Sequence, residues 1–257
     1  MCGICELSHQ LFTMRMKFIN KKYIWLIFLS GITTCQNLPG DWADYWKDSG
    51  QSIMTDQTNQ WVLGLGALGA LGALQVDMKI KDYAQNEGLL SDPVSHFGDL
   101  YGGTWGHWIL WSSILATSVI DKDNPEDFIS KMQFSTFALV TNGFLTYGMK
   151  WGFGRERPNS SCCESFPSGH TSHSFTIAAI AHELYGNKVG VMAYGIATLV
   201  AASRINDNKH YLSDVIFGAA LGTAVGRGFA SKYNEYVDKD YELGITPQMQ
   251  LRFTIPL

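Results

Sequence analysis

Six apolar segments, each bounded by polar residues or by Gly and Pro, constrain the fold of this chain more than any other feature. They cover roughly residues 61–80, 104–120, 126–149, 169–186, 189–204 and 210–231. The sequence signals for β-strands are weak. The sequence therefore predicts an all-α fold, a bundle of about six core helices. The polar, Gly-rich stretch 81–103 is expected to be a loop.

The charge content separates this chain from several classes of protein. Charged residues make up 16% and hydrophobic residues 46% of the 257 residues, which excludes disorder and favours a membrane or a very apolar helical core. The net charge of -4 disfavours nucleic acid as a partner. Uncharged runs such as Trp61–Val76 are shorter than the roughly 17 residues that a membrane-spanning helix needs. Full spanning is therefore disfavoured, although an integral inner-membrane protein stays an alternative.

Residues 1–35 are expected to lie outside the folded domain, which then comprises residues 36–257. Three lysines precede a ten-residue apolar stretch and a short segment that ends at Cys35. This order is typical of an export signal, and the apolar stretch is too short to span a bilayer. Met16 is a second candidate start, which would make residues 1–15 an overhang. Ordinary cleavage, lipidation of Cys35 and an uncleaved anchor all stay open.

Three clusters of polar residues lie at the ends of apolar segments. Consecutive helices joined by short loops pack antiparallel, so the end of the third segment, the start of the fourth, the end of the fifth and the start of the sixth meet at one end of the bundle. The active site is expected there. The residues brought together would be Lys150, Arg157, Ser168, Gly169, His170, Arg204, His210 and Asp214.

The cationic members of this set suit an anion the size of phosphate. Lys150, Arg157 and Arg204 supply positive donors, and arginine matches phosphate oxygens in a bidentate manner. Ser168 and Gly169 open the fourth segment, where a helix N-terminus offers free N–H groups and the positive end of its dipole.

The histidines add a possible nucleophile and a possible acid. His210 and Asp214 are four residues apart and share one helix face. A carboxylate in that position can hold the proton of one ring nitrogen, which leaves the other nitrogen as a nucleophile. His170 can protonate a leaving oxygen.

Lys150-x6-Arg157-Pro158, Pro167-Ser168-Gly169-His170 and Ser203-Arg204-x5-His210-x3-Asp214 together resemble the three-part signature of the phosphatidic acid phosphatase type 2 superfamily. That superfamily includes lipid phosphatases, bacterial non-specific acid phosphatases and vanadium haloperoxidases. Every signature position is filled without substitution.

The resemblance implies a metal-independent phosphatase that forms a phosphohistidine. His210 would be the nucleophile, Asp214 its orienting partner, and His170 the acid for the leaving alcohol and then the base for water. Lys150, Arg157, Arg204 and the Ser168–Gly169 backbone would bind the phosphate. No metal or cofactor is expected, and vanadate is expected as an inhibitor. The resemblance also agrees with an exported protein on the periplasmic face of a bacterial envelope, membrane-associated or periplasmic.

Two other functions stay open at this level: a vanadate-dependent haloperoxidase, for which vanadate would be the cofactor, and a phosphate-binding envelope protein without turnover. The substrate is expected to be a phosphomonoester or a lipid (pyro)phosphate, with a lean towards lipid and towards membrane association. The sequence leaves the oligomeric state and the role of Cys162 and Cys163 open. Arg155 is expected to be a solvated charge, with a contribution to the cationic field as the alternative. His107 and His173 are expected to be packing residues, with a place in the wall of the site as the alternative.

Overall fold

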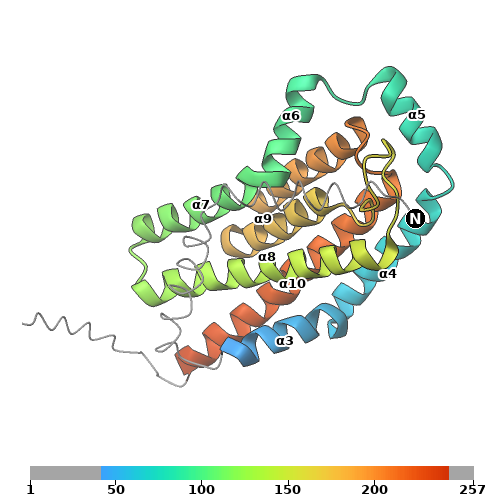
Figure 1. The fold of residues 1–257 in the computed structure, drawn as a ribbon. Coiled ribbons are helices and arrows are strands. Elements are labelled where there is room, and N and C mark those ends of the chain that lie inside the picture. The colour runs from blue at the N-terminus through green and yellow to red at the C-terminus, as the bar shows by residue number, and fades with distance from the viewer. Residues whose placement is uncertain (1–41, 243–257) are drawn as a thin grey trace, which may run out of the picture.

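A computed structural model describes residues 42–242, and the expectations for residues 1–35 fall outside this range. The all-α prediction is confirmed, because the elements of the described part are all helical (Figure 1). They are α3 (Trp42–Thr55), α4 (Gln57–Ala73), α5 (Asp77–Glu87), α6 (Asp92–Leu100), the π-helical turn η2 (Tyr101–Trp105), α7 (Gly106–Asp121), α8 (Pro125–Phe153), α9 (Gly169–Asn206) and α10 (Leu212–Glu242).

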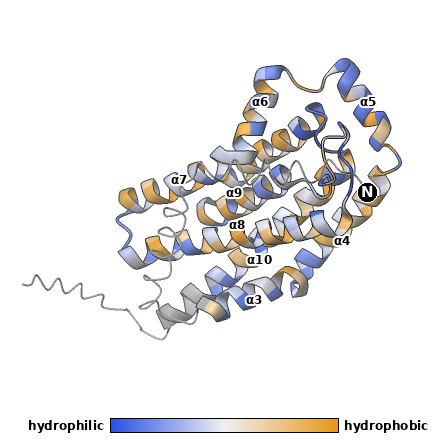
Figure 2. Cartoon of the chain, viewed as in Figure 1, coloured by the Kyte–Doolittle hydropathy of each residue, from blue (hydrophilic) through white to orange (hydrophobic). Residues whose placement is uncertain are grey.

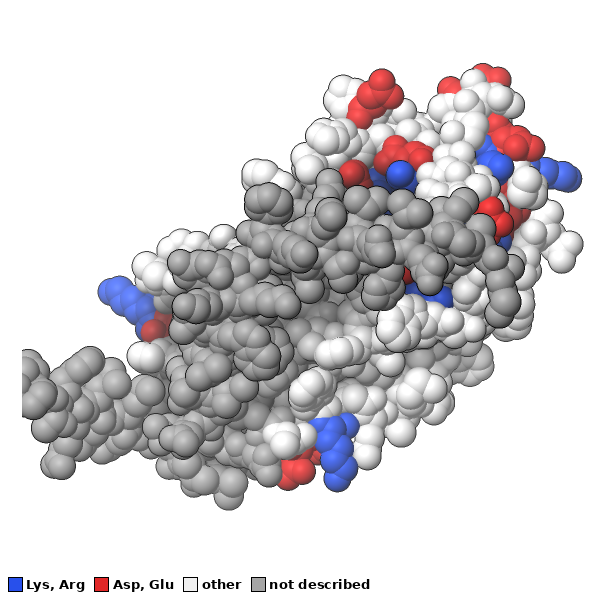
Figure 3. Space-filling view, in the orientation of Figure 1, with Lys and Arg blue, Asp and Glu red and all other residues white. Residues whose placement is uncertain are grey.

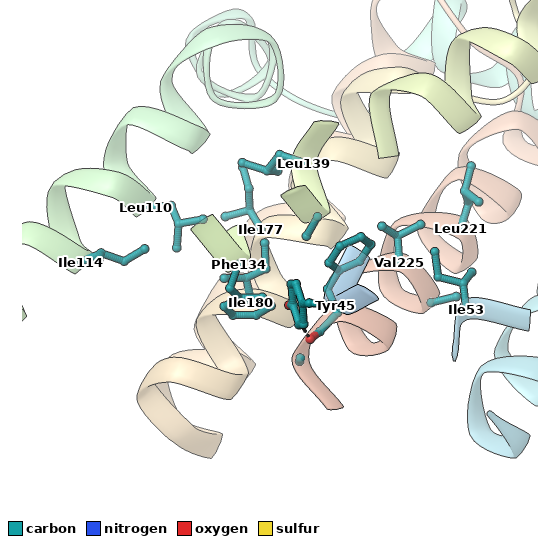
Figure 4. Close-up of a cluster of buried hydrophobic side chains, with 14 residues drawn as sticks. Tyr45, Ile53, Leu110, Ile114, Phe134, Leu139, Ile177, Ile180, Leu221 and Val225 are labelled. Atoms are coloured by element: carbon teal, nitrogen blue, oxygen red, sulfur yellow. Dashed lines mark hydrogen bonds between the residues drawn. The ribbon is translucent and has the colours of Figure 1, made fainter. Parts of the chain in front are cut away.

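Helix α10 lies at the centre of the bundle and packs against α3, α4, α8 and α9. The main apolar core forms where these helices meet α7 (Figure 4). Phe134, Ile180 and Phe229 are fully buried in it, and each such side chain stabilises the fold by about 1.5–3 kcal/mol. Tyr45 of α3 packs edge-on against Phe229 and donates its hydroxyl hydrogen to the Phe229 carbonyl at 3.0 Å.

Small residues allow the helices to approach α10 closely, as the Gly-Ala-Leu repeat of the first apolar segment predicts. A Cβ atom added at Gly66 of α4 would lie 2.2 Å from the Cβ of Ala220. One added at Gly222 would lie 2.1 Å from the carbonyl oxygen of Ser172 on α9. Neither contact leaves room for a side chain, so the positions of α4 and α9 depend on these two glycines.

Helix α9 is a hairpin with two antiparallel arms. Gly186 interrupts it with φ 77° and ψ -175°, a conformation that glycine adopts without strain. The arms pack against one another, with the rings of Phe175 and Tyr194 5.8 Å apart. The hairpin therefore returns the chain to the end of the bundle where it began, as the alternation of segments predicts.

The prediction of a loop at 81–103 is wrong, because most of that stretch is helical. Gly88, with φ 75°, ends α5 after its last turn, and Pro93 stands in the first turn of α6, where proline is favoured. Helix α6 packs on α9, and a Cβ atom at Gly98 would lie 2.5 Å from Ser203 Oγ. The polarity of the stretch reflects short helices with one exposed face.

The helices display large apolar side chains on their outer faces. Exposed fractions reach 64% for Trp61 on α4, 70% for Val119 on α7 and 82% for Trp151 on α8. Figure 2 shows apolar residues along these helices and polar residues around α5 and the loop before α9. Among residues 42–242, α9 is the one helix that meets the length and hydropathy of a membrane span when it is counted as continuous, but the break at Gly186 divides it into two arms. Helices α4 and α5, bent by 72°, would make a second span if taken together.

Candidate active site

A cavity of about 270 Å³ lies at the end of the bundle where α8 ends and α9 begins. It brings together five of the eight residues that the sequence singles out: Lys150, Arg157, Gly169, His170 and His210. The other three lie behind its wall. Ser168, Arg204 and Asp214 are at most 3% exposed.

Two cations of this cavity have no carboxylate partner. Lys150 is 5% exposed and donates to the Glu164 carbonyl at 2.5 Å, while the Nε of Arg157 is buried without a partner. Within residues 42–242, neither side chain comes within 4.0 Å of a carboxylate oxygen. Burial, and then the neighbouring Arg157, lowers the pKa of Lys150 to about 8. Two partly desolvated cations that form no ion pair within the described residues make a binding site for an anion.

His210 is held in the tautomer that a nucleophile needs. Its ring is 4% exposed, and Nδ1 lies 2.7 Å from the carbonyl oxygen of Ser165. A carbonyl can only accept, so Nδ1 carries the hydrogen and the lone pair is on Nε2. Burial lowers the pKa of His210 to about 4, with Lys150 and Arg157 adding to the effect and Asp214 opposing it. The imidazole is therefore neutral at ordinary pH.

The sequence-based role of Asp214 as direct partner of His210 needs correction. The two side chains share a helix face as predicted, but Nδ1 lies 3.7 Å from Asp214 Oδ2, beyond hydrogen-bond distance. Asp214 Oδ2 instead accepts from the Ser165 hydroxyl at 2.5 Å and from the Tyr211 amide at 2.8 Å. Asp214 therefore fixes Ser165, and the carbonyl of Ser165 accepts the hydrogen bond from His210. Ser165 lies in a loop, where helical spacing gives no signal.

Arg204 and His170 converge on one carboxylate. Arg204 forms ion pairs with Asp207 at 2.8 Å and with Asp99, and His170 Nε2 lies 3.3 Å from Asp99 Oδ1. Burial raises the pKa of Asp99, but Arg204 and His170 outweigh this effect and hold it below its usual value. Asp99 ends α6, in the stretch predicted to be a loop. The sequence around Asp99 gives no signal of its role, because its partners His170 and Arg204 lie more than 70 positions away.

The start of α9 supplies backbone N–H donors, but the N–H of Ser168, which the sequence predicts as a phosphate donor, is not one of them. The N–H of Ser168 donates to the Asp214 carbonyl at 3.1 Å, which joins the starts of α9 and α10. The first helical hydrogen bond runs from the Ser172 amide to the Ser168 carbonyl at 3.0 Å. The N–H groups of Gly169 and the next two residues therefore stand at the helix start, where no carbonyl of the helix reaches them.

Three residues that the sequence predicts mainly as solvated or packing residues belong to the site or support it. They are Arg155, His107 and His173. Arg155 forms ion pairs with Asp77 at 2.8 Å and Asp214 at 2.7 Å, so its interpretation as a solvated charge is wrong. His107 and His173 both line the cavity, with ring centroids 5.5 Å apart. They pack against each other, and they also form part of its wall.

Comparison with known proteins identifies the part of the chain that carries the site. Residues 134–237, which include α8 from its third turn, α9 and most of α10, match the model of the PAP2 superfamily. This part of the chain, called the PAP2 domain below, is similar to that superfamily. This is the superfamily that the three motifs resemble.

Curated relatives of the PAP2 domain include the lipid A 1-phosphatase of Porphyromonas gingivalis, 42% identical over 90 residues, which are 34% of this chain and 20% of that protein. The lipid phosphate phosphatase 1 of Arabidopsis thaliana is 29% identical over 147 residues, covering 41% of this chain and 44% of that protein. The chain thus spans less than half the length of either relative.

A solved structure shares the fold of the PAP2 domain and its neighbouring helices. It is the transmembrane PAP2-type phosphatidylglycerolphosphate phosphatase of Bacillus subtilis, with a TM-score of 0.52 and 21% identity. The match covers 73% of this chain and 97% of that one. Within residues 42–242 no group of three or more His, Cys, Asp or Glu side chains could hold a metal ion. Metal independence stays a prediction.

Proposed function

We propose that this protein is a phosphatase that removes phosphate from a lipid, with His210 as the nucleophile. The observation that carries the proposal is the cavity in which Lys150 and Arg157, neither paired with a carboxylate of the described residues, stand beside a neutral His210. A phosphate group would supply the missing negative charge. The two relatives, a lipid A 1-phosphatase and a lipid phosphate phosphatase, support the same reaction class.

The geometry supports two chemical steps. In the first, His210 Nε2 attacks phosphorus, a P–N bond forms, and the bond between phosphorus and the lipid oxygen breaks while His170 protonates that oxygen. In the second, His170 takes a proton from water, whose oxygen attacks phosphorus, and the P–N bond breaks to release inorganic phosphate. Lys150, Arg157 and the start of α9 stabilise the charge that develops on the phosphoryl oxygens in both steps.

The surroundings of the cavity favour a lipid over a soluble phosphomonoester. Tyr147 lines the cavity and is 60% exposed, and Phe144 and Trp151 of the same helix are 69% and 82% exposed. On α7, Trp108 is 58% exposed. Apolar groups displayed beside a phosphate site suit an acyl chain whose headgroup enters the cavity, and they make membrane association part of the proposal.

The distribution of charge agrees with contact between the helices and a membrane. On the face shown in Figure 3, the charged side chains of the described residues gather mainly at the end formed by α5 and α6, and the described surface along the helices carries few. The order of lysines and apolar residues in 16–35 supports placing the phosphate site on the exported side of the cytoplasmic membrane.

Phosphate release by the purified full chain in detergent tests the proposal. Phosphatidic acid in mixed micelles, an isoprenyl pyrophosphate and p-nitrophenyl phosphate would be compared at equal concentration. We expect the lipid substrates to react faster, and a covalent phosphoenzyme with the acid lability of a phosphoramidate to form. His210→Ala should abolish both signals.

His182→Ala is the matched control, because His182 hydrogen-bonds Asn187 at 2.7 Å across the Gly186 turn of α9, at the opposite end of the bundle from the cavity. It should keep wild-type turnover. Turnover in His210→Ala at the wild-type rate, or a wild-type protein inactive on all three substrates, would refute the proposal. Faster reaction of p-nitrophenyl phosphate would refute the lipid preference alone.

A further inference from the structure

A chain of polar contacts connects α5 to the proposed nucleophile through residues that the family motifs do not specify. It begins at Asp77, the first residue of α5, which is 3% exposed. Asp77 Oδ1 accepts from the Ser213 amide at 2.9 Å, and Oδ2 accepts from the Ser213 hydroxyl at 2.6 Å. Asp77 therefore fixes the first turn of α10, the helix that carries Asp214.

Arg155 is the second member of the chain and joins two carboxylates. Its Nη2 lies 2.8 Å from Asp77 Oδ2, and its Nη1 lies 2.7 Å from Asp214 Oδ1. Its guanidinium also stacks over the ring of Tyr211 at 4.3 Å. The planar fork of arginine reaches both carboxylates at once, which the single ammonium of lysine does not.

The contacts continue from Asp214 to the ring of His210. Asp214 Oδ2 accepts from the Ser165 hydroxyl, and the Ser165 amide donates to the Arg155 carbonyl at 2.8 Å. Ser165 is thus fixed from both sides. Its own carbonyl then accepts from His210 Nδ1 at 2.7 Å. Each link is short, and all but one of the side chains in it are at most 4% exposed; Arg155 is 26% exposed.

We propose that Asp77 and Arg155 are positioning residues for the phosphatase reaction, acting through Asp214 and Ser165 to hold His210 with its Nε2 lone pair in the cavity. The inference rests on the proposed function, in which His210 attacks phosphorus. Asp77 and Arg155 do not touch the substrate. They fix the loop that fixes the nucleophile.

The bend between α4 and α5 explains why this role falls to Asp77. The two helices meet at 72°, and the break at residues 74–76 places the start of α5 against the start of α10. A continuous helix would carry Asp77 past that point. The bend therefore brings a carboxylate from outside residues 134–237 to the support of the site.

A purely structural role for the same contacts predicts a different result. If Asp77 and Arg155 only fasten α5 to the domain, their loss lowers thermal stability and leaves the turnover of folded enzyme unchanged. If they position His210, their loss lowers kcat while KM changes little, because the phosphate-binding groups Lys150 and Arg157 are untouched.

The experiment compares Asp77→Asn, Arg155→Lys and Ser213→Ala with wild type in the full chain, using phosphatidic acid in mixed micelles. We expect Asp77→Asn to lower kcat between about tenfold and a hundredfold, since small displacements of a reacting group have effects of that size. KM should stay within about threefold. Arg155→Lys should keep part of the activity, because it retains the charge and loses the fork. Lys131→Gln, which removes the ion pair with Asp123 at the other end of α8, is the control and should leave kcat unchanged.

Nitrogen-15 NMR of labelled histidine supplies a readout that does not require turnover. Wild type should show His210 protonated at Nδ1, and Asp77→Asn should show a mixture of tautomers. A folded Asp77→Asn with wild-type kcat and an unchanged His210 tautomer would overturn the inference while His210→Ala still established the proposed function. An inactive wild type would overturn the function, and the tautomer would still decide whether Asp77 controls His210. Should Asp77→Asn fail to fold, Ser213→Ala tests the same link.

Discussion

Replacement of Arg204 by alanine should show how far the positive charge of Arg204 offsets the negative charge of Asp99 beside the proposed phosphate site. Arg204 is 3% exposed and holds the carboxylates of Asp99 and Asp207. The resemblance of the motif assigns Arg204 to the phosphate, and loss of one preorganised donor typically raises the barrier by about 2.7–4 kcal/mol, a fall of about 10²- to 10³-fold in kcat. In Arg204→Ala this loss is accompanied by a second effect, because Asp99 is left with its charge uncompensated.

The size of the second effect follows from the position of His170. Its Nε2 lies 3.3 Å from Asp99 Oδ1, and a phosphate oxygen hydrogen-bonded to the same nitrogen would be within about 6 Å of that carboxylate. Two unit charges at that separation repel by about 3 kcal/mol at an effective dielectric constant of about 20. Because the Asp99 side chain is 48% exposed, solvent and salt reduce this to about 1 kcal/mol, or about fivefold in rate.

The assay is kcat/KM for phosphate release by Arg204→Ala, Asp99→Asn and the double variant. We expect a loss of at least a hundredfold in Arg204→Ala and a recovery of about fivefold when Asp99→Asn is added to it. Asp99→Asn alone should change kcat/KM by less than tenfold. Recovery should shrink at high salt. A loss below tenfold in Arg204→Ala would place that residue outside the site, and a double variant no more active than Arg204→Ala would refute the electrostatic reasoning about Asp99.

Three further predictions concern pH, packing and metal. Because burial lowers the pKa of His210 to about 4, the acidic limb of kcat/KM should lie near pH 4; a limb near pH 6.5 would contradict this. The unfolded chain takes up that proton near pH 6.5, so His210 makes the free energy of unfolding decrease as the pH falls from about 6.5 to 4, measurable by urea titration of wild type against His210→Gln. Gly222→Ala should lower Tm by several degrees, since its Cβ would meet the Ser172 carbonyl at 2.1 Å, whereas Gly195→Ala, where nothing lies within 4 Å, should leave Tm unchanged or raise it. Chelators should leave turnover unaffected, since imidazole, lysine and arginine supply the nucleophile and the positive charge; loss that Mg²⁺ restores would contradict this.

The motif residues could be predicted from the sequence because their positions follow from helix ends. Lys150 closes α8, Gly169 opens α9 and His210 precedes α10, so alternation of antiparallel helices is enough to bring them to one end. The same reasoning places the turn of α9 at Gly186. It also predicts that His210 and Asp214 share a face, because four residues make about one helical turn.

The supporting residues could not be predicted, because their partners are set by loops and by contacts distant in sequence. Nothing near Asp77 or Asp99 in the sequence indicates Ser213 or Arg204, more than a hundred positions away. Nothing in the sequence around Arg155 indicates that its guanidinium contacts two carboxylates. The hydrogen-bond acceptor of His210 is a backbone carbonyl, which no side-chain pattern encodes.

The sequence by itself determined the helical class of this protein and most of the residues that gather at the proposed phosphate site, since both depend on local periodicity and on the order of helix ends. Only the tertiary structure decided which cations form ion pairs. Arg155 and Arg204 pair with carboxylates from α5 and α6, whereas Lys150 and Arg157 form no ion pair within residues 42–242. The physical reason is that a nearby carboxylate offsets the attraction of a lysine or arginine for an anion. The distance between the two charges decides how large that effect is, and tertiary packing sets the distance.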